Sequence, residues 1–257
     1  MKRISLLLTL ILGVITFTDT LSQGKISKNK KAIINSLEAH KDRLIEISDN
    51  IWEAAEPALL EFKSSKYLWD YAEENGFKVT KGVADIPTAF TAEYGSGRPI
   101  IGIMGEFDAN PGISQKKQPT KEPLVKGAAG HGCGHNLFGT ASLGAAIAIK
   151  EMIESGQISG TVRFYGTPAE ETIFAKVWMV RAGLFDDLDV CMDWHPGDEI
   201  EASTQSSKAL VDFRLRFYGD ASHASGDPWN GNSAVDAMEL YTTGLNYYRE
   251  HIRPTAR

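Results

Sequence analysis

Thiol, imidazole and carboxylate side chains occur at four places where an apolar run of the sequence ends. The four segments are Gly105-Glu106-Phe107-Asp108, His131-Gly132-Cys133-Gly134-His135-Asn136, Gly166-Thr167-Pro168-Ala169-Glu170-Glu171 and Trp194-His195-Pro196. Thiolate, imidazole and carboxylate together form a ligand set for zinc, and a carboxylate-rich set can also hold manganese. These residue types therefore predict a metal site.

The spacing within each segment indicates separate tasks. Cys133 and His135 are two residues apart with glycines beside the cysteine, so an extended backbone lets both face one point. One of the adjacent Glu170 and Glu171 can bind a metal while the other acts as general base. Each pattern also has an ordinary explanation: a local turn around Cys133, a solvated helix start at the glutamates, and simple packing of His195. Their joint placement at successive strand ends favours the metal site.

The elements that position these segments alternate between helix and strand. Apolar residues recur at three- and four-residue steps from residue 30 to 75, and Gly76 follows as the expected helix end. Further helices are predicted at residues 137–154 and 172–182, and strands at residues 77–80, 89–94, 100–104, 161–167 and 190–195. The second and third of these strands read as a hairpin across Gly95-Ser96-Gly97. The pattern predicts an α/β fold with a mainly parallel sheet flanked by helices, whose carboxyl-end edge gathers functional groups.

Three regions are expected along the chain. Residues 1–24 are typical of a signal peptide, because Lys2 and Arg3 precede an apolar run that ends at Phe17. A short membrane anchor is the alternative, but the run is shorter than the roughly 20 residues that span a bilayer. Secretion, or a periplasmic location, is therefore expected.

The remaining chain is expected to form a catalytic domain at residues 25–205 and the start of an α+β lid or dimerisation domain at residues 206–257. The second domain offers one alternating strand, residues 209–218, and one helix, residues 233–250. Two elements cannot bury a core of their own, so the chain is expected to be truncated at its C-terminus.

Composition excludes one class of partner and leaves the cysteines open. A formal net charge of −6 without any basic tract argues against nucleic acid. Cys133 and Cys191 are the two cysteines, and an oxidising compartment would permit a disulfide between them. A metal-bound thiolate is the preferred use of Cys133, since each cysteine lies near a histidine that can do chemistry.

Taken in order, the four segments resemble those of the two-metal aminoacylase/carboxypeptidase (M20-type) amidohydrolase family. Gly-Glu-Phe-Asp-Ala-x-Pro-Gly, His-x-Cys-Gly-His-Asn, Pro-Ala-Glu-Glu and Trp-His-Pro carry the resemblance. It extends to residues 87–90 and 219–240, and within the family it is similar to the branch of aminobenzoyl-glutamate hydrolases and related N-acyl-amino-acid amidohydrolases. The resemblance implies a metal-dependent hydrolase that cleaves the amide bond of an N-acyl or aminobenzoyl amino acid, or of a dipeptide.

The resemblance also implies roles for individual residues. The implied ligands of two divalent ions, zinc or manganese, are Cys133, His135, Glu171 and His195. Glu170 is similar to the general base, Asp108 to an aspartate that orients a ligand, and His223 to a lid histidine that stabilises the oxyanion. A homodimer through the lid domain is implied as well.

The chain departs from the family's pattern at two points. Glu106 stands where the aminoacylase members carry a histidine, and no histidine here matches a further metal ligand of the family. An inactive fragment of the family and a disulfide-containing binding protein are therefore the alternatives to an active hydrolase.

Overall fold

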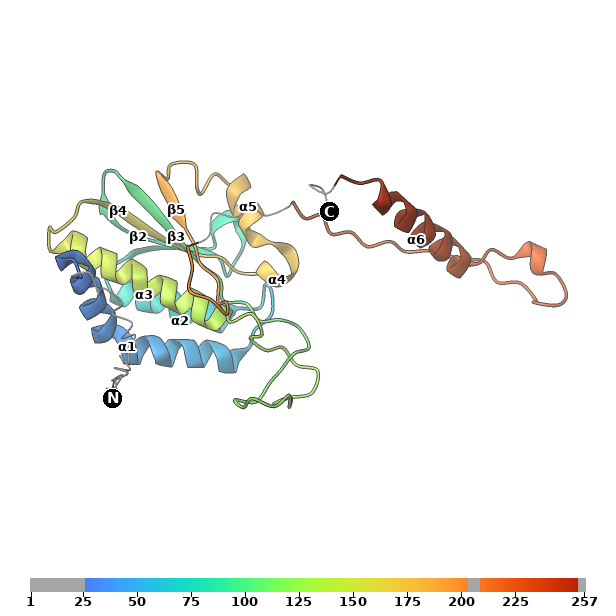
Figure 1. Ribbon diagram of the computed structural model, residues 1–257, viewed down its shortest axis with the longest axis horizontal. Helices are drawn as coiled ribbons and strands as arrows, with labels where there is room; N and C mark the ends of the chain where they lie inside the picture. The colour runs from blue at the N-terminus through green and yellow to red at the C-terminus, as the bar shows by residue number, and fades with distance from the viewer. Residues whose placement is uncertain (1–25, 203–208, 254–257) are drawn as a thin grey trace, which may run out of the picture. The chain divides into compact units, whose positions relative to one another are not determined.

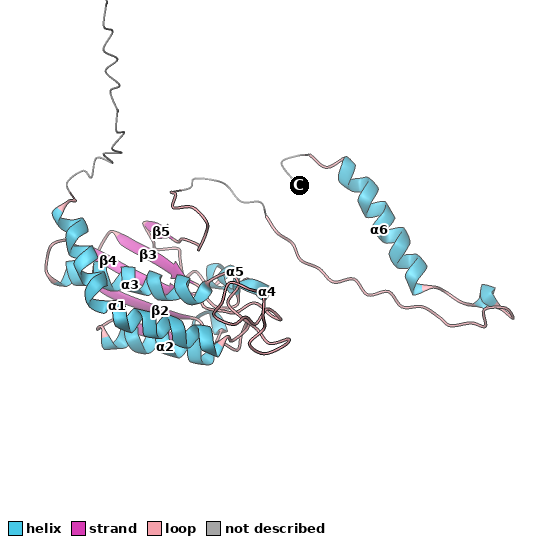
Figure 2. Cartoon of the chain, turned by 60° about the horizontal axis from the view of Figure 1, so that its bottom comes forward, coloured by secondary structure: helices cyan, strands magenta, loops and turns pink. Residues whose placement is uncertain are grey.

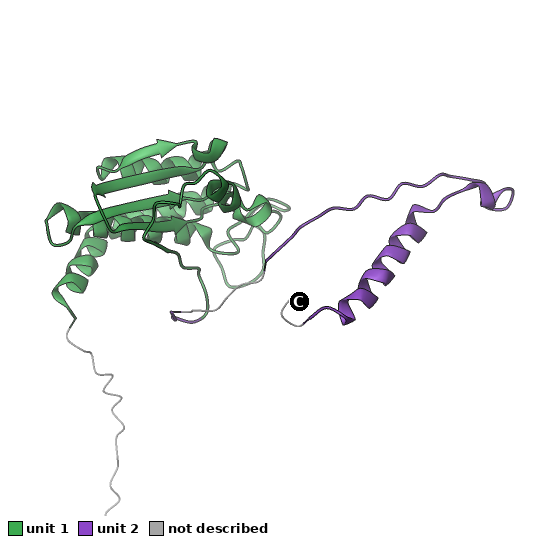
Figure 3. Cartoon of the chain, turned by 90° about the horizontal axis from the view of Figure 1, so that it is seen from above, with its two compact units in different colours: residues 1–198 green, residues 199–257 purple. Residues whose placement is uncertain are grey.

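The computed structural model describes residues 26–202 and 209–253, which fall into two compact units (Figure 3). The first unit ends at Asp198 and the second begins at Glu199. The expected signal peptide, residues 1–24, and the expected domain boundary at residues 205/206 lie outside the described residues. Within the described ranges, every helix is too short or too polar to cross a bilayer.

The first unit is built on one five-stranded sheet in the order β1-β2-β4-β3-β5. In that order the strands are Lys78–Lys81, Phe90–Ser96, Gly160–Gly166, Ile100–Gly105 and Val190–Met192. The pairings of β1 with β2 and of β2 with β4 are antiparallel, whereas β4 with β3 and β3 with β5 are parallel. The α/β class is confirmed, but the sheet is mixed rather than mainly parallel.

The expected hairpin between the second and third strands is wrong, because β4 lies between them. Ser96 at the end of β2 pairs with Gly160, and Ile100 at the start of β3 pairs with Thr161 on the opposite side of β4. Nearly every residue of β4 is buried. A strand that is apolar on both faces belongs in the middle of a sheet, and this preference overrides the short turn that made β2 and β3 look adjacent.

Three long helices cover one face of the sheet (Figure 1). They are α1 (Lys28–Ala54), α2 (Phe62–Glu74) and α3 (His135–Glu154). Their buried side chains, such as Ile51 and Leu143, form one core cluster with the strand residue Phe164. The adjacent strand residue, Tyr165, packs instead with Met179 in a second cluster, as the two-residue period of a strand requires. The sheet therefore separates two cores.

The second core is covered by short elements. The 3₁₀ helix η1 (Val83–Asp85) and the helix α5 (Ala175–Arg181) lie there. One helix was predicted at residues 172–182, but the structure has α4 (Glu170–Ile173) and α5 separated by Phe174, whose φ of 56° is left-handed. The paired glutamates consequently lie on the first turn of a very short helix rather than on a long one (Figure 2).

Close backbone contact fixes the start of α3 against the end of β3. A Cβ on Gly139 would lie 2.6 Å from the carbonyl oxygen of Glu106, and one on Gly105 would lie 3.0 Å from the Cα of Gly139. Only glycine permits this approach. The predicted close packing of this helix through Gly139 is confirmed, and it brings His135 at the start of α3 to the end of β3.

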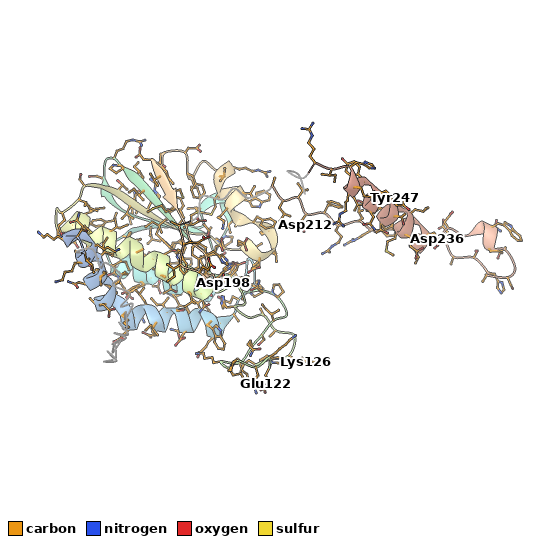
Figure 4. The ribbon with its side chains drawn as sticks, in the orientation of Figure 1. Glu122, Lys126, Asp198, Asp212, Asp236 and Tyr247 are labelled. Carbon is orange, nitrogen blue, oxygen red and sulfur yellow. The ribbon has the colours of Figure 1, made fainter. Side chains whose placement is uncertain are left out.

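The second unit contains the helix α6 (Ala234–Glu250) and a 3₁₀ turn, η2 (Pro228–Asn230). Ser233 caps α6, since its Oγ accepts a hydrogen bond from the backbone N–H of Asp236 at 3.1 Å. Asp236 and Tyr247 mark the two ends of this helix in Figure 4. The predicted helix is confirmed.

The strand predicted at residues 209–218 is wrong. Residues 209–219 form no strand, and the nearest pairing is a single antiparallel bridge between Asp220 and Asn232. A strand exists only through its hydrogen bonds to a neighbour, and no other described segment pairs with this one. Its apolar side chains are consequently exposed, among them Leu210, Phe213 and Leu215.

Candidate metal centre

The predicted metal ligands of the first unit converge at one edge of its sheet. Two overlapping groups have ligand atoms that all lie within 4.8 Å of one another. They are Cys133 with His135 and Glu171, and Glu106 with His135 and His195. The contributing segments follow β3, β4 and β5 or precede α3. The strand ends thus bring together the four predicted ligands, with His135 common to both groups.

His135 is the buried centre of the site, with 1% of its surface exposed. Its Nδ1 donates to the Oδ1 of Asp108 at 3.0 Å and lies 3.2 Å from the carbonyl oxygen of the same residue. In the neutral ring this places the lone pair on Nε2, which faces the other candidate ligands. Burial alone would lower the pKa of His135, but the hydrogen bond and negative charge of Asp108 raise it above its usual value.

Asp108 also holds the loop that carries the paired glutamates. Its Oδ2 accepts a hydrogen bond from the backbone N–H of Glu171 at 2.9 Å, and its side chain is buried. One carboxylate therefore orients the imidazole of His135 and fixes the position of Glu171. This geometry is what the orienting role expected for Asp108 requires, and the role itself stays a prediction.

Cys133 is positioned by a residue that the sequence did not single out, Asn110. The Oδ1 of Asn110 accepts hydrogen bonds from the backbone N–H groups of Gly132 and Cys133 at 3.1 and 3.2 Å, and its Nδ2 donates to the Sγ of Cys133 at 3.5 Å. The carboxylate of Glu171 raises the pKa of the Cys133 thiol above its usual value, and burial adds to the shift. Both Cys133 and Cys191 are free, so the structure does not contain the disulfide of the alternative interpretation.

His195 is exposed and completes the centre from the segment after β5. Its Nδ1 donates to the carbonyl oxygen of Pro196 at 2.9 Å, which leaves Nε2 as the ligand atom of the neutral ring. The ring centroids of His195 and His135 are 5.5 Å apart. Gly134 has a φ of 78°, and a Cβ there would lie 3.0 Å from the Cγ of Pro196. Glycine at position 134 thus allows the two segments to meet.

Glu106 lies inside the centre, although the sequence left its role open. It is 4% exposed, and its Oε2 lies 2.9 Å from the Nε2 of His135 without hydrogen-bond geometry. Its Oε1 contacts the ammonium group of Lys176 from α5. Burial lowers the pKa of Lys176, partly opposed by the charge of Asp193. The position next to His135 makes Glu106 a candidate ligand beside the four predicted ones.

Glu170, the predicted general base, is half-buried on the first turn of α4. Burial raises the pKa of its carboxyl above the usual value, and the adjacent charge of Glu171 raises it further. A carboxyl with a raised pKa takes up and returns a proton closer to neutral pH. The environment is therefore suited to a general base, and the role stays a prediction.

His223 lies in the second unit. Its Nδ1 accepts hydrogen bonds from the backbone N–H groups of Ser225 and Gly226 at 3.3 and 3.0 Å. The neutral ring consequently carries its proton on Nε2, where it can act as a donor. Its predicted contact with the oxyanion stays a prediction.

The chemistry of the donor set fits a divalent metal ion. The Oε2 of Glu106, the Nε2 of His135 and the Oε1 of Glu171 are buried and have no hydrogen-bond partner. The last two atoms are 3.8 Å apart. Buried acceptors without a donor cost roughly 1–3 kcal/mol each, and more when they are charged. A cation bound among these three atoms would satisfy all of them.

An open pocket of about 630 Å³ adjoins the centre. Its lining includes Trp52, His131, Cys133, Leu137, His195 and Asp198. Asp198, at the end of the first unit, is labelled in Figure 4. An indole and an aliphatic side chain beside two candidate ligands provide a wall for an apolar group next to the metal position.

The mixed sheet and its ligand-bearing strand ends define an α/β protein of the metallopeptidase class. The chain belongs to the peptidase family M20/M25/M40, whose model matches residues 102–249. The expected membership of this family is thereby confirmed.

Several characterised proteins are similar to this chain. It is 45% identical to one of the two subunits of p-aminobenzoyl-glutamate hydrolase of Escherichia coli (strain K12), over 88% of this chain and 47% of that protein. It is 31% identical to Xaa-Arg dipeptidase of Mus musculus, over 93% of this chain and 54% of that protein. The chain thus spans about half the length of the curated relatives it matches.

Solved structures share the fold. A dinuclear metal-binding peptidase of the M20 family from Bacillus subtilis superposes with a TM-score of 0.52 at 26% identity, covering 60% of this chain and 42% of that one. A putative aminohydrolase from methicillin-resistant Staphylococcus aureus gives a TM-score of 0.63 at 23% identity, covering 87% of this chain and 58% of that one. Both support the fold class, and the first combines it with a metal centre in the same family.

The two cysteines allow a matched test of the centre. We expect Cys133→Ser to weaken zinc binding by at least tenfold, because a hydroxyl is a poorer zinc ligand than a thiolate. Cys191→Ser is the control, since Cys191 belongs to neither candidate group. Isothermal titration with zinc measures both. Equal affinity of the Cys133 variant and the unchanged protein would remove Cys133 from the centre.

Proposed function

We propose that this protein hydrolyses the amide bond of N-acyl or aminobenzoyl amino acids, or of dipeptides, with two divalent ions, zinc or manganese. One observation carries the proposal. Buried acceptors from Glu106, His135 and Glu171 face one another without a donor, beside a carboxyl of raised pKa and next to an open pocket. Such an arrangement serves to hold cations where a substrate can reach them.

The residues divide the work in the proposed reaction. Divalent ions held by Cys133, His135, Glu171 and His195, with Glu106 as a further candidate, would polarise the carbonyl and make water more acidic. Glu170 takes the proton of the attacking water and returns it to the leaving amine. Asp108 holds the ring of His135 and the amide of Glu171. The Nε2–H of His223 is proposed as a donor to the developing oxyanion.

The substrate class rests on the relatives and the pocket. The p-aminobenzoyl-glutamate hydrolase of Escherichia coli, the Xaa-Arg dipeptidase and the N-acetylcysteine deacetylase of Bacillus subtilis all carry names that describe an amide bond to an amino acid. The pocket wall formed by Trp52 and Leu137 suits an apolar or aromatic acyl group. We therefore propose an aminobenzoyl or another acyl group in this pocket.

An inactive member of the family is the alternative. It would bind the metal ions without turnover, whereas the proposed enzyme couples binding to hydrolysis. Release of p-aminobenzoate or of a free amino acid from the loaded protein distinguishes the two. A metal-loaded protein that releases neither favours the alternative.

The second unit is proposed to mediate a homodimer. Its helix α6 exposes apolar side chains along its length, including Met238, Leu240 and Tyr247. Exposed apolar surface of this kind is typical of an interface. This chain is similar to both kinds of polypeptide in the Escherichia coli hydrolase, at 45% and 29% identity, so a second, related chain is the other partner to consider.

Sedimentation of the purified protein tests the dimer. We expect a dimer that Leu240→Asp converts largely to monomer, because a charge in an apolar interface must be desolvated. Asp236→Ala is the control on the same helix, since it changes no apolar side chain. A monomeric unchanged protein that dimerises only with a second, related chain would replace the homodimer with a heterodimer.

Secretion is proposed from the first residues of the sequence. Lys2 and Arg3 followed by an apolar run to Phe17 support a signal peptide within residues 1–24. We expect the mature protein outside the inner membrane and shorter than the translated chain. Fractionation and N-terminal sequencing check this, and an intact Met1 in the cytoplasm would contradict it.

The paired glutamates provide the sharpest test of the mechanism. Glu170→Gln should lower kcat by about 10²- to 10⁴-fold while metal content stays the same, because an amide cannot take up a proton. Glu171→Gln should instead lower metal content. Turnover of p-aminobenzoyl-glutamate and bound metal are measured on the same samples. Exchanged phenotypes would reverse the two roles.

A further inference from the structure

Glu61 is a fully buried carboxyl outside the ligand groups. It lies at the start of α2 and is 0% exposed. Among residues 26–202 and 209–253, no Lys, Arg or His forms an ion pair with it. A buried ionisable group without a countercharge is costly, so its contacts are expected to serve a purpose.

Its two oxygens join three segments that are distant in sequence. The Oε1 of Glu61 accepts a hydrogen bond from the backbone N–H of Ala169 at 2.9 Å. Its Oε2 accepts one from the Oγ1 of Thr88 at 3.1 Å. Thr88 and Ala169 are both 0% exposed. The carboxyl therefore links α2 and the segment before β2 to the residue directly before Glu170.

Ala169 has a conformation that needs such a link. Its φ of 57° is left-handed, which costs an L-residue roughly 1–2 kcal/mol. Its carbonyl oxygen accepts from the backbone N–H of Phe174 at 2.9 Å, and that closes the short helix α4. A strained residue persists where its surroundings hold it, and Glu61 supplies the bond to its N–H.

The bond has a counterpart on the other side of Glu170. The backbone N–H of Glu171 donates to the Oδ2 of Asp108 at 2.9 Å. Buried carboxyls therefore hold the amides immediately before and immediately after Glu170. The backbone of Glu170 is fixed from both sides while its own side chain stays half-exposed at the site.

We propose that Glu61 is the positioning residue for Glu170: by holding the N–H of Ala169, it fixes the direction in which the base points. The proposal rests on the role proposed above for Glu170. Asp108 performs the corresponding task for Glu171 and the metal, so loss of Glu61 disturbs the base and leaves the ligands in place.

The environment of Glu61 also indicates which substitution preserves this task. Burial raises the pKa of Glu61 to about 7, and the charge of Asp108 contributes in the same direction. A neutral carboxyl is therefore well populated at neutral pH, and a glutamine of the same shape keeps an oxygen for Ala169 and an NH₂ group for the Oγ1 of Thr88. Alanine keeps neither.

The test compares Glu61→Ala and Glu61→Gln in the metal-loaded protein. We expect kcat to fall at least tenfold in the alanine variant and to stay within about threefold in the glutamine variant, with KM and zinc content unchanged in both. Hydrogen exchange at the amide of Ala169, measured without substrate, should accelerate with alanine and stay slow with glutamine. Unchanged kcat and unchanged exchange in the alanine variant would overturn the proposal.

A matched control is present at the same helix start. The carboxylate of Glu56 accepts hydrogen bonds from the backbone N–H groups of Lys63 and Ser64 at 2.9 to 3.1 Å. Glu56→Ala removes a carboxylate bond from the start of α2 without touching residues 169–171. We expect it to lower thermal stability while kcat stays within about threefold. An equal loss of kcat in both alanine variants would indicate general loosening of α2 and overturn the specific role of Glu61.

The double variant separates this proposal from the proposed function. In the Glu170→Gln background, Glu61→Ala should lower kcat no further, because residues that act as a unit are not additive. Full turnover of Glu170→Gln alone would contradict the proposed function, whereas an additive loss in the double variant would contradict only the positioning role. If Glu61→Ala does not melt cooperatively, Thr88→Val, which removes one of the two bonds, replaces it with an expected loss of several-fold.

Discussion

The buried carboxylate of Asp108 is the interaction on which the site depends. It receives the Nδ1 proton of His135 and the backbone N–H of Glu171, so one residue orients ligands from two different segments. A carboxylate that accepts two hydrogen bonds at 1% exposure has little freedom to rotate. Any displacement of Asp108 would turn the imidazole and move the glutamate loop together. The spacing of the candidate ligands is therefore set by Asp108 before any metal ion binds.

Asp108 can reach both partners because of the way the sheet is paired. β3 and β4 run parallel in register, and Gly105 pairs with Gly166 at their carboxyl ends. The segment with Asp108 and the segment with Glu171 therefore leave the sheet side by side. The antiparallel strands β1 and β2 lie beyond β4 and bring no ligand to this edge. Close contact at Gly105 and Gly139 then sets the start of α3, and with it His135, against the same edge.

The sequence predicted the ligand-bearing segments better than the supports around them. Cys133, His135 and Glu171 could be found because their residue types are rare in such combinations and each follows a strand or precedes a helix. Asn110 and Glu61 could not, since an asparagine in a loop and a glutamate before a helix usually face solvent, and only the folded chain shows them against backbone amides. The hairpin failed for a related reason: local turn chemistry indicates which strands follow one another, whereas burial decides which strand takes the centre of the sheet.

The charges around His135 explain why the centre calls for cations. Glu106, Asp108, Glu170 and Glu171 surround one imidazole, and Lys176 contacts only Glu106. Burial lowers the pKa of Lys176, which reduces its capacity to balance the carboxylates. Like charges held at short distance in a poorly solvated site raise the free energy of the folded chain. A divalent ion that binds only the folded form removes this repulsion and stabilises the fold by mass action. The same carboxylates that make the metal-free centre costly thus make it a strong cation site.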